Sequence, residues 1–452
     1  MKSFVYWWFI ILTIGGIVLA DENYVTVYNQ NLALVKQVRT VEITRSNLPL
    51  KFTDVAAKII PTSVHLRNLS GNQDFTILEQ NFEYDLVSGE KILDKYIDHE
   101  VEIITDRGQL ISGILLSKSG RSLVLKTDDG IRILPLNDKM QINVKDLPEG
   151  LITRPTLIWE VAGVKNGKEK LEVSYLTEGM NWHAEYVGVL NENATQLGLD
   201  AWVSVENQSG ATFQDARLKL VAGEIHRAPS PQIQEYAMEA MAPAYKRTGR
   251  QKGFQERSFF EYHIYELQRP TTLKNNQIKQ ISLFPAATVK CHKEFVYSPW
   301  RDSENIFVKL AFENKKSQGL GIPLPAGIFR IYKKDQESLE FIGEDRIDHT
   351  PRNESVKVTM GKAFDLKAER KVVTTTKISD RSQKMTVEIE LRNHKEKEAV
   401  TILVDERMPA IQWKISDSNF SYKKIDVTRV EFNVPVPAND KVKLRYTVVY
   451  SW

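Results

Sequence analysis

Two clusters of side chains have the residue types that bind metal ions. Glu261, His263 and Tyr265 alternate along the chain, so on a β-strand they would share one face. Only two of them are good metal ligands, which favours a mixed, solvent-exposed face over a metal site. The other cluster is an acidic loop that precedes a proline: Glu344, Asp345, Asp348 and His349. Its carboxylates could hold a hard cation, but turn chemistry explains the same residues, and we predict no metal site in either cluster.

Aromatic and thiol side chains provide two further candidates. Trp182, Trp202 and Trp413 have the flat rings that stack on sugars. Large aromatic residues at strand positions usually lie in a core, and we predict that here. Cys291 is the only cysteine, so no intramolecular disulfide can form. It alternates with Val289 in a strand-like segment, which favours a buried, small apolar residue over a nucleophile.

The short motifs that mark common catalytic and binding sites are absent from the sequence. It contains no His-Glu-x-x-His, Gly-x-Ser-x-Gly, phosphate-binding Gly-rich loop, Cys-x-x-Cys or EF-hand pattern, and the eight histidines are scattered singly. We therefore predict no catalytic, cofactor-binding or metal-ligating residue, and no cofactor. A catalytic site assembled from residues distant in sequence stays open as an alternative, because a motif search does not detect one.

The elements that would position any site are predicted to be β-strands. Apolar and polar residues alternate with a period of two along much of the chain, as they do on strands with one buried face. Clear examples begin at Tyr24, Leu171, Leu199, Phe307, Met385 and Val442. Amphipathic helical patterns of three turns or more are absent. We predict an all-β protein built from several β-sandwich modules of immunoglobulin-like type.

Residues 86–146 are predicted to form an inserted small β-barrel of the SH3-like or Sm-like type. A short amphipathic helix precedes strand-like segments, and turns at Gly108, Gly120 and Gly130 separate these as in consecutive hairpins. The segments are residues 100–104, 109–116, 122–126 and 131–134. A helix followed by five short strands, with a glycine that permits sharp bending in the second, is the order expected for such a barrel. Its loops mix acidic and basic residues, so we expect a protein-contact or spacing module that does not bind RNA.

The first 20 residues have the pattern of a secretory signal peptide. Lys2 supplies a positive charge, residues 4–20 are uncharged and mostly apolar, and small or modest residues precede a cleavage position at Ala20. The stretch is short for an uncleaved membrane anchor, which takes about 20 apolar residues. We expect export to the periplasm, cell envelope or exterior, with no transmembrane helix after cleavage. A formal net charge of +3 over 452 residues does not favour a nucleic-acid partner.

Two features interrupt the strand pattern. Residues 228–256 combine Ala-Pro-Ser-Pro, a Met- and Ala-rich stretch and several basic residues without alternation, so we predict a flexible linker that trypsin cuts first. Three strand-like segments end in similar phrases at Asn207, Asn314 and Asn393, each followed by polar turn residues. Asparagine tolerates left-handed φ and hydrogen-bonds its own turn. We therefore interpret the three phrases as loose repeats of a sandwich hairpin.

The domain organisation follows from these features. A chain of 452 residues is too long for one hydrophobic core, and about three domains are expected. The predicted division is a signal peptide at 1–20, part of an N-terminal β-domain at 21–85, the inserted barrel at 86–146, a β-sandwich at 147–227, the linker at 228–256, a β-domain continuing the core at 257–370 and a C-terminal immunoglobulin-like β-sandwich at 371–452.

Several phrases in the second part of the chain resemble one bacterial family. They include Tyr175-Leu-Thr-Glu-Gly-Met-Asn-Trp, Trp202-Val-Ser-Val-Glu-Asn and Leu324-Pro-Ala-Gly, in a fixed order from about residue 151 to the C-terminus. The family is the one catalogued as domain of unknown function 4139. Some relatives are called mucoidy inhibitor-like and are associated with the envelope or exopolysaccharide, but they carry a coiled coil where this chain has the predicted barrel. The resemblance implies a class and a compartment, and no agreed active site.

Together these features predict an exported cell-envelope interaction or scaffold protein, whose partner is an envelope protein or a polysaccharide. Export, modular all-β organisation and the missing catalytic motifs favour this interpretation. The competing class is an envelope hydrolase or carbohydrate-active enzyme with a dispersed site. A second alternative is an outer-membrane-associated β protein, because the last strand alternates as such proteins do, although a terminal sandwich strand explains the same residues. The alternating residues are Leu444, Tyr446, Val448, Tyr450 and Trp452.

Overall fold

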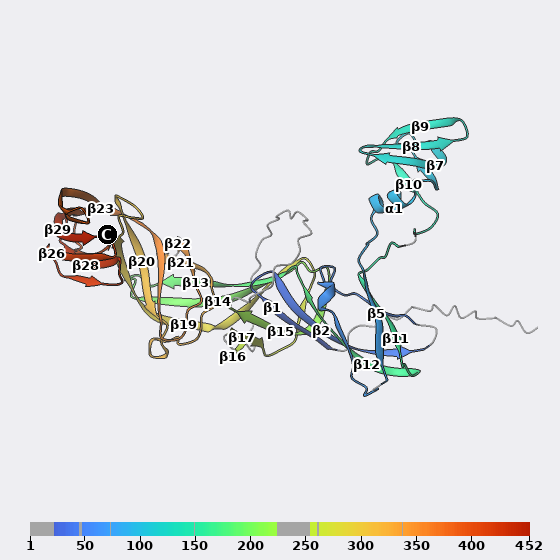
Figure 1. Cartoon of the computed structure of the whole chain (residues 1–452), viewed down its shortest axis with the longest axis horizontal. Helices are drawn as coiled ribbons and strands as arrows, with labels where there is room; N and C mark the ends of the chain where they lie inside the picture. The colour runs from blue at the N-terminus through green and yellow to red at the C-terminus, as the bar shows by residue number, and fades with distance from the viewer. Residues whose placement is uncertain are drawn as a thin grey trace, which may run out of the picture.

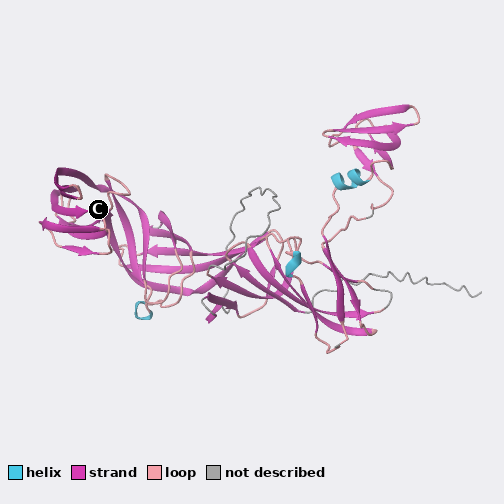
Figure 2. Cartoon of the chain, viewed as in Figure 1, coloured by secondary structure: helices cyan, strands magenta, loops and turns pink. Residues whose placement is uncertain are grey.

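Strands make up most of the computed structural model, which confirms the predicted all-β class (Figures 1 and 2). The structure describes residues 22–44, 48–72, 74–148, 150–223, 254–259, 262–336 and 338–452. The predicted signal peptide lies outside these residues. So does the predicted linker, apart from residues 254–256, which begin a strand. Among the described residues, no helix has both the length and the apolar character needed to cross a membrane.

Strands form because alternate side chains can be buried on one face. In β13 (Met180–Leu190) the side chains of Trp182, Ala184 and Tyr186 are buried, while those of His183 and Glu185 lie on the other face. Burying one large side chain stabilises the fold by about 1.5–3 kcal/mol. A shift of one residue in register would exchange the two faces, so the core specifies the register of this strand.

The N-terminal part contains two sheets. The larger has eight strands in the order β16 (Phe254–Phe259), β17 (Tyr262–Leu267), β15 (Phe213–Ala222), β1 (Glu22–Tyr28), β2 (Leu32–Ile43), β12 (Gly167–Thr177) and β4 (His65–Asn68), with β18 (Thr271–Leu273) paired to β15. The smaller has the order β3 (Leu50–Thr53), β11 (Thr156–Ala162) and β5 (Thr76–Glu83). A short 3-10 helix, Pro61–Ser63, precedes β4.

A thirteen-stranded sheet forms the centre and the C-terminal part. Its main order is β22 (Ser338–Ile347), β21 (Gly327–Asp335), β13, β14 (Gln196–Asn207), β19 (Gln277–Tyr297), β20 (Asn305–Glu313), β23 (Ser355–Ser379), β24 (Ser382–Asn393), β29 (Asp440–Ser451) and β26 (Gln412–Ser418). Three further strands branch from β19, namely β25 (Val400–Arg407), β28 (Arg429–Val436) and β27 (Tyr422–Lys424). A 3-10 helix, Lys316–Gln318, follows β20. The sheet turns back on itself at the C-terminal end, so its last strands form a sandwich.

Three hydrophobic cores stabilise the described residues. The first lies between the N-terminal and central sheets, the second inside the C-terminal sandwich and the third in the insert. The first two share strands. β19 places Val289 in the first core and Tyr297 in the second. β23 does the same with Val358 and Leu366, and β20 also contributes to both cores.

The insert is one five-stranded antiparallel sheet with a helix beside it. After α1 (Gly89–Lys95) the sheet order is β10 (Gln141–Asn143), β6 (Glu100–Ile104), β7 (Leu110–Ser119), β8 (Ser122–Thr127) and β9 (Gly130–Pro135). β9 and β10 do not pair, so the sheet is open and the likeness to an SH3-like or Sm-like barrel stays a prediction. A Cβ on Gly113 would lie 2.6 Å from the Lys126 carbonyl oxygen, so glycine lets β8 approach the bent β7. The chain leaves for the insert after β5 and returns before β11, and these two strands pair.

Three buried asparagines at the ends of strands hold the adjoining loops. Asn207, Asn314 and Asn393 are each at most 1 % exposed; Asn207 and Asn393 end β14 and β24, and Asn314 directly follows β20. None has the left-handed φ that the sequence suggested. Each Oδ1 instead accepts a backbone N–H of the following loop, and each Nδ2 donates to carbonyls there and on another segment. The carbonyls are those of Ala211 and Leu273, of Ile322 and Pro351, and of Glu398, Val436 and Pro437.

The last strand belongs to the C-terminal sandwich. β29 pairs with β24 on one side and β26 on the other. Leu444, Tyr446 and Val448 point into the second core and are at most 1 % exposed. The alternation at the C-terminus therefore serves this core.

Candidate functional site

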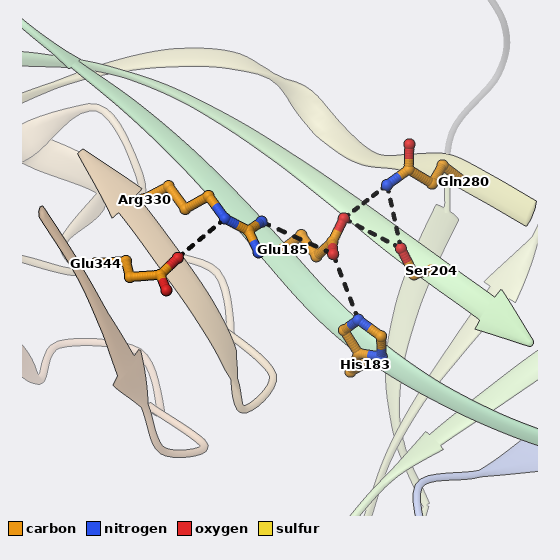
Figure 3. A network of polar contacts seen from close by, with 6 residues as sticks. All are labelled: His183, Glu185, Ser204, Gln280, Arg330 and Glu344. Carbon is orange, nitrogen blue, oxygen red and sulfur yellow. Dashed lines mark hydrogen bonds and ion pairs between the residues drawn. The ribbon is translucent and has the colours of Figure 1, made fainter. Parts of the chain in front are cut away.

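A network of polar side chains lies on one face of the central sheet (Figure 3): His183, Glu185, Ser204, Gln280, Arg330 and Glu344. They come from β13, β14, β19, β21 and β22. On β14, Ser204 lies opposite His183 of β13 on one side and opposite Gln280 of β19 on the other. Side chains directly opposite each other on neighbouring strands have Cβ atoms about 4.5–5.5 Å apart, so the pairing order brings these groups into contact.

Glu185 is the centre of the network. Its Oε2 accepts hydrogen bonds from Gln280 Nε2 at 2.6 Å and Ser204 Oγ at 3.1 Å. Its Oε1 lies 3.4 Å from His183 Nε2 and 3.8 Å from Arg330 Nη1. The Glu185 side chain is only 17 % exposed, although it lies on the solvent side of the sheet. Both carboxylate oxygens of Glu185 are therefore in contact with neighbouring polar side chains.

Arg330 lies between two carboxylates. Its Nε donates to Glu344 Oε2 at 3.1 Å, and its Nη1 faces Glu185. Arg330 and Glu344 lie opposite each other on β21 and β22. Arg330 therefore connects the edge strand β22 to Glu185 on β13, which pairs with β21. A guanidinium can serve both carboxylates because its five donors point in fixed directions.

The pKa of Glu185 is lowered from its ordinary value. The largest cause is the hydrogen bond from His183, helped by Ser204 and by the charge of Arg330, and together these outweigh the effect of burial. The carboxyl is therefore ionised at neutral pH. A general acid needs a raised pKa, so this network is suited to accepting hydrogen bonds and to joining strands.

A second buried carboxylate lies in the C-terminal sandwich. Glu406 of β25 is 2 % exposed, and its Oε1 accepts from Arg370 Nε at 2.8 Å. Its Oε2 accepts from the Tyr446 hydroxyl at 2.9 Å. Burial raises the pKa of Glu406 despite the charge of Arg370. Because Tyr446 belongs to the second core, the carboxyl lies beside this core and is almost closed to solvent.

The first candidate metal cluster, Glu261, His263 and Tyr265, is only partly described by the structure. Glu261 lies outside the described residues. Tyr265 is 3 % exposed, donates its hydroxyl to the Pro323 carbonyl at 3.2 Å and packs edge-on against Trp182. His263 is half-buried on the same strand, β17. The prediction that Tyr265 lies on a solvent-exposed face is wrong, because its side chain packs in the first core.

The predicted acidic loop is partly a strand, because Glu344 and Asp345 lie in β22, and its polar groups act separately. Glu344 binds Arg330, and Asp345 Oδ2 accepts the Thr359 N–H at 2.7 Å. His349 Nδ1 accepts the N–H of Ala326 at 3.1 Å, while Asp348 is exposed. Within the described part of the chain, no group of three or more His, Cys, Asp or Glu side chains is placed to hold a metal ion.

The three tryptophans differ in their surroundings. Trp182 is 2 % exposed and donates to the Val221 carbonyl at 3.1 Å, as expected for a core residue. Trp413 is half-buried and donates to the Val427 carbonyl at 2.6 Å. Trp202 is 37 % exposed and lies opposite Glu185 on the solvent face, so the prediction of a core position is wrong for it.

Cys291 is buried, and burial raises the pKa of its thiol to about 11. Its Sγ contacts the Ala194 carbonyl at 3.7 Å. A thiol with a raised pKa is a poor nucleophile at neutral pH, which agrees with the structural role expected from the sequence.

Sequence reasoning did not identify Glu185, Gln280, Arg330 or Glu406 as members of polar clusters. Glu185 and Gln280 are 95 residues apart in the sequence. No short motif contains both, and the weak signal available was a polar residue on the solvent side of each alternating strand.

Comparison with known proteins places the chain in a family. A search of curated proteins finds no match. A family model described as Domain of unknown function (DUF4139) matches residues 171–452, which include β13, β14, β19 and the whole C-terminal sandwich. The match covers more than half of the chain and contains every residue of both carboxylate clusters, so this protein belongs to the DUF4139 family.

Proposed function

We propose that this chain is an exported cell-envelope protein that works as a stiff interaction scaffold. The observation that supports this most is that β19, β20 and β23 each run through two hydrophobic cores. Bending between the cores would require these strands to lose ladder hydrogen bonds and buried contacts. Domains joined by an exposed linker usually move relative to each other, whereas shared strands resist such motion.

The elongated arrangement suits a scaffold. Figure 1 shows the C-terminal sandwich at one end and the insert projecting near the other, with the central sheet between them. The insert also presents apolar side chains to solvent, since Ile131 is 68 % and Ile133 is 70 % exposed. Exposed apolar groups gathered on one face are typical of contact surfaces. A stiff body with separated surfaces can hold two partners at a set distance.

The competing function is a hydrolase or carbohydrate-active enzyme. It would need a carboxyl with a raised pKa within reach of solvent. The two shifted carboxyls described above do not combine these properties. Glu185 is near the surface with a lowered pKa, and Glu406 has a raised pKa inside a core. Both arrangements favour structural roles for these residues.

The proposal is tested in two steps in a host that produces the full chain. N-terminal sequencing of protein from the envelope fraction should find a mature chain that begins at Asp21. Photo-reactive side chains at Ile133 in the insert and at Tyr422 in the C-terminal sandwich, both exposed, should then cross-link partners within one complex. A cytoplasmic chain that begins at Met1, or release of soluble products from cell-wall polymers by the purified protein, would contradict the proposal.

A further inference from the structure

A short turn at the second core displays two large side chains. It connects β19 to β20 and carries Trp300 and Arg301, which are both exposed. The turn is held firmly, because Asp302 Oδ1 accepts the N–H of Asn305 at 2.9 Å and the Tyr297 hydroxyl donates to a carbonyl of the turn at 2.7 Å. The hydrogen bond from Lys362 and those from the turn's own N–H groups hold the pKa of Asp302 well below its usual range. The two exposed side chains are therefore presented on a fixed backbone.

Aromatic rings hold two arginines in place at this turn. The Arg407 guanidinium carbon lies 3.8 Å from the centre of the Trp300 ring. The Arg301 guanidinium carbon lies 4.5 Å from the centre of the Phe307 ring. A guanidinium that lies over a ring still has its N–H groups available at its edge, and its planar fork matches a carboxylate. These two arginines are pre-oriented before any ligand arrives.

The surrounding charges leave a positive surplus. Three carboxylates nearby are each already paired with a base: Asp302 with Lys362 at 2.8 Å, Glu294 with Lys357 at 2.8 Å and Asp405 with Arg429 at 3.1 Å. By contrast, Arg301, Lys309 and Arg407 have no ion pair within 4.0 Å in the described part of the chain. Burial, together with the charges of Arg301 and Lys357, lowers the pKa of Lys309. Glu294 lies directly opposite Lys309, but it is also paired with Lys357, so the six basic groups named here outnumber the three carboxylates.

We propose that this surface, formed by Trp300, Arg301, Phe307, Lys309 and Arg407 and called the Trp300 surface below, docks an acidic segment of a partner protein. The positive surplus complements carboxylates. Tryptophan and arginine are the residue types most enriched at the energetic centres of protein interfaces. A neutral sugar is a poorer match, since it would stack on a free ring face and Arg407 already covers one face of Trp300.

This inference rests on the proposed scaffold function and specifies that one partner has an acidic segment. The turn lies at the second core, which contains Tyr297 and Ile306 on either side of it, and β19 and β20 connect it to the first core. Partners bound there would be held at a set distance from the insert. Localisation and cross-linking through Ile133 do not depend on the Trp300 surface, so failure here would leave the scaffold proposal intact.

The test measures binding of a fluorescein-labelled decamer of glutamate to the full chain by fluorescence anisotropy at low salt. The triple variant Arg301→Gln, Lys309→Gln, Arg407→Gln removes the surplus charge. A matched control, Lys414→Gln, Lys423→Gln, Lys424→Gln, removes three exposed lysines from the C-terminal sandwich, and Lys424 is also stacked on a tryptophan, 4.7 Å from the Trp413 ring centre. Thermal melts establish that both triple variants are folded.

We expect the first triple variant to bind the peptide about tenfold or more weakly, and the control to bind like the unmodified chain. Arg407→Lys keeps the charge but loses the planar fork, so it should weaken binding as well without risk to the fold. Equal losses in both triple variants, or no binding by the unmodified chain, would overturn the proposal. Polygalacturonate that binds more tightly than the peptide, and loses binding in the first triple variant, would assign the surface to an acidic glycan instead.

Discussion

Two glutamates in neighbouring parts of the molecule have opposite electrostatic settings. Glu185 lies on the solvent face of the central sheet, where four neighbours contact its carboxylate and its pKa is lowered. Glu406 lies inside the C-terminal sandwich, where an arginine and a tyrosine bind it and its pKa is nevertheless raised. The difference lies in the largest cause of each pKa shift, which is a hydrogen bond for Glu185 near solvent and the removal of charge from water for Glu406 in the core.

The largest effect is expected from removing the base beside Glu406. Arg370→Met leaves a carboxyl that is 2 % exposed without its charged partner, and should lower the free energy of unfolding by about 3–5 kcal/mol. Urea denaturation followed by circular dichroism measures this. Arg392→Met on the outer face of the same sandwich is the control, because its ion pairs are long and partly exposed. Equal costs for the two variants would mean that burial of the Glu406 pair does not matter.

A smaller effect is expected at the central sheet. Glu185→Ala removes the acceptor of the Gln280 and Ser204 hydrogen bonds, but Gln280 is exposed and can bond to water, whereas Ser204 is only 2 % exposed. The expected cost is about 2 kcal/mol, measured by the same denaturation. A cost as large as that of Arg370→Met would show that the network is as sealed from water as the C-terminal core.

The two glutamates should respond to pH with opposite signs. The lowered pKa of Glu185 contributes stability that is present above the ordinary pKa of 4.5 and is lost as the pH falls below it. The raised pKa of Glu406 means that the folded chain binds this proton more tightly, so its contribution to stability improves as the pH falls towards 4.5. Denaturation of the unmodified chain, Glu185→Gln and Glu406→Gln from neutral pH to below 4.5 gives the two differences. Parallel pH trends would contradict the assignment.

The smallest effect is expected at the rim of the network. Glu344→Gln removes the charge from a side chain that is 54 % exposed, and an ion pair so exposed contributes less than about 1 kcal/mol. Arg330 keeps its contact with Glu185 in this variant. A loss of stability above that seen for Glu185→Ala would place the centre of the network at Arg330 instead.

Local pattern was sufficient for the strands and for many of their boundaries. Residues 100–104 and 122–126 were predicted from alternation and turn glycines, and they fall within β6 and β8. The end of β14 at Asn207 was recognised from a repeated phrase. The physical explanation offered from the sequence, a left-handed turn, was incomplete. Asn207 is held by hydrogen bonds from its Nδ2 to two carbonyls, one of them 66 residues away at Leu273.

The sequence by itself determined the all-β class, because burial on one face of a strand requires a period of two whatever the strand pairs with. It also determined the buried position of Cys291, which alternates with other core residues. Strand order was decided only by the tertiary structure. The polar network exists because β13 pairs with β14 and β21, and the Trp300 surface exists because β25 lies beside β19. Such pairings join residues far apart in the chain through hydrogen bonds that any backbone can make, so no local pattern encodes them.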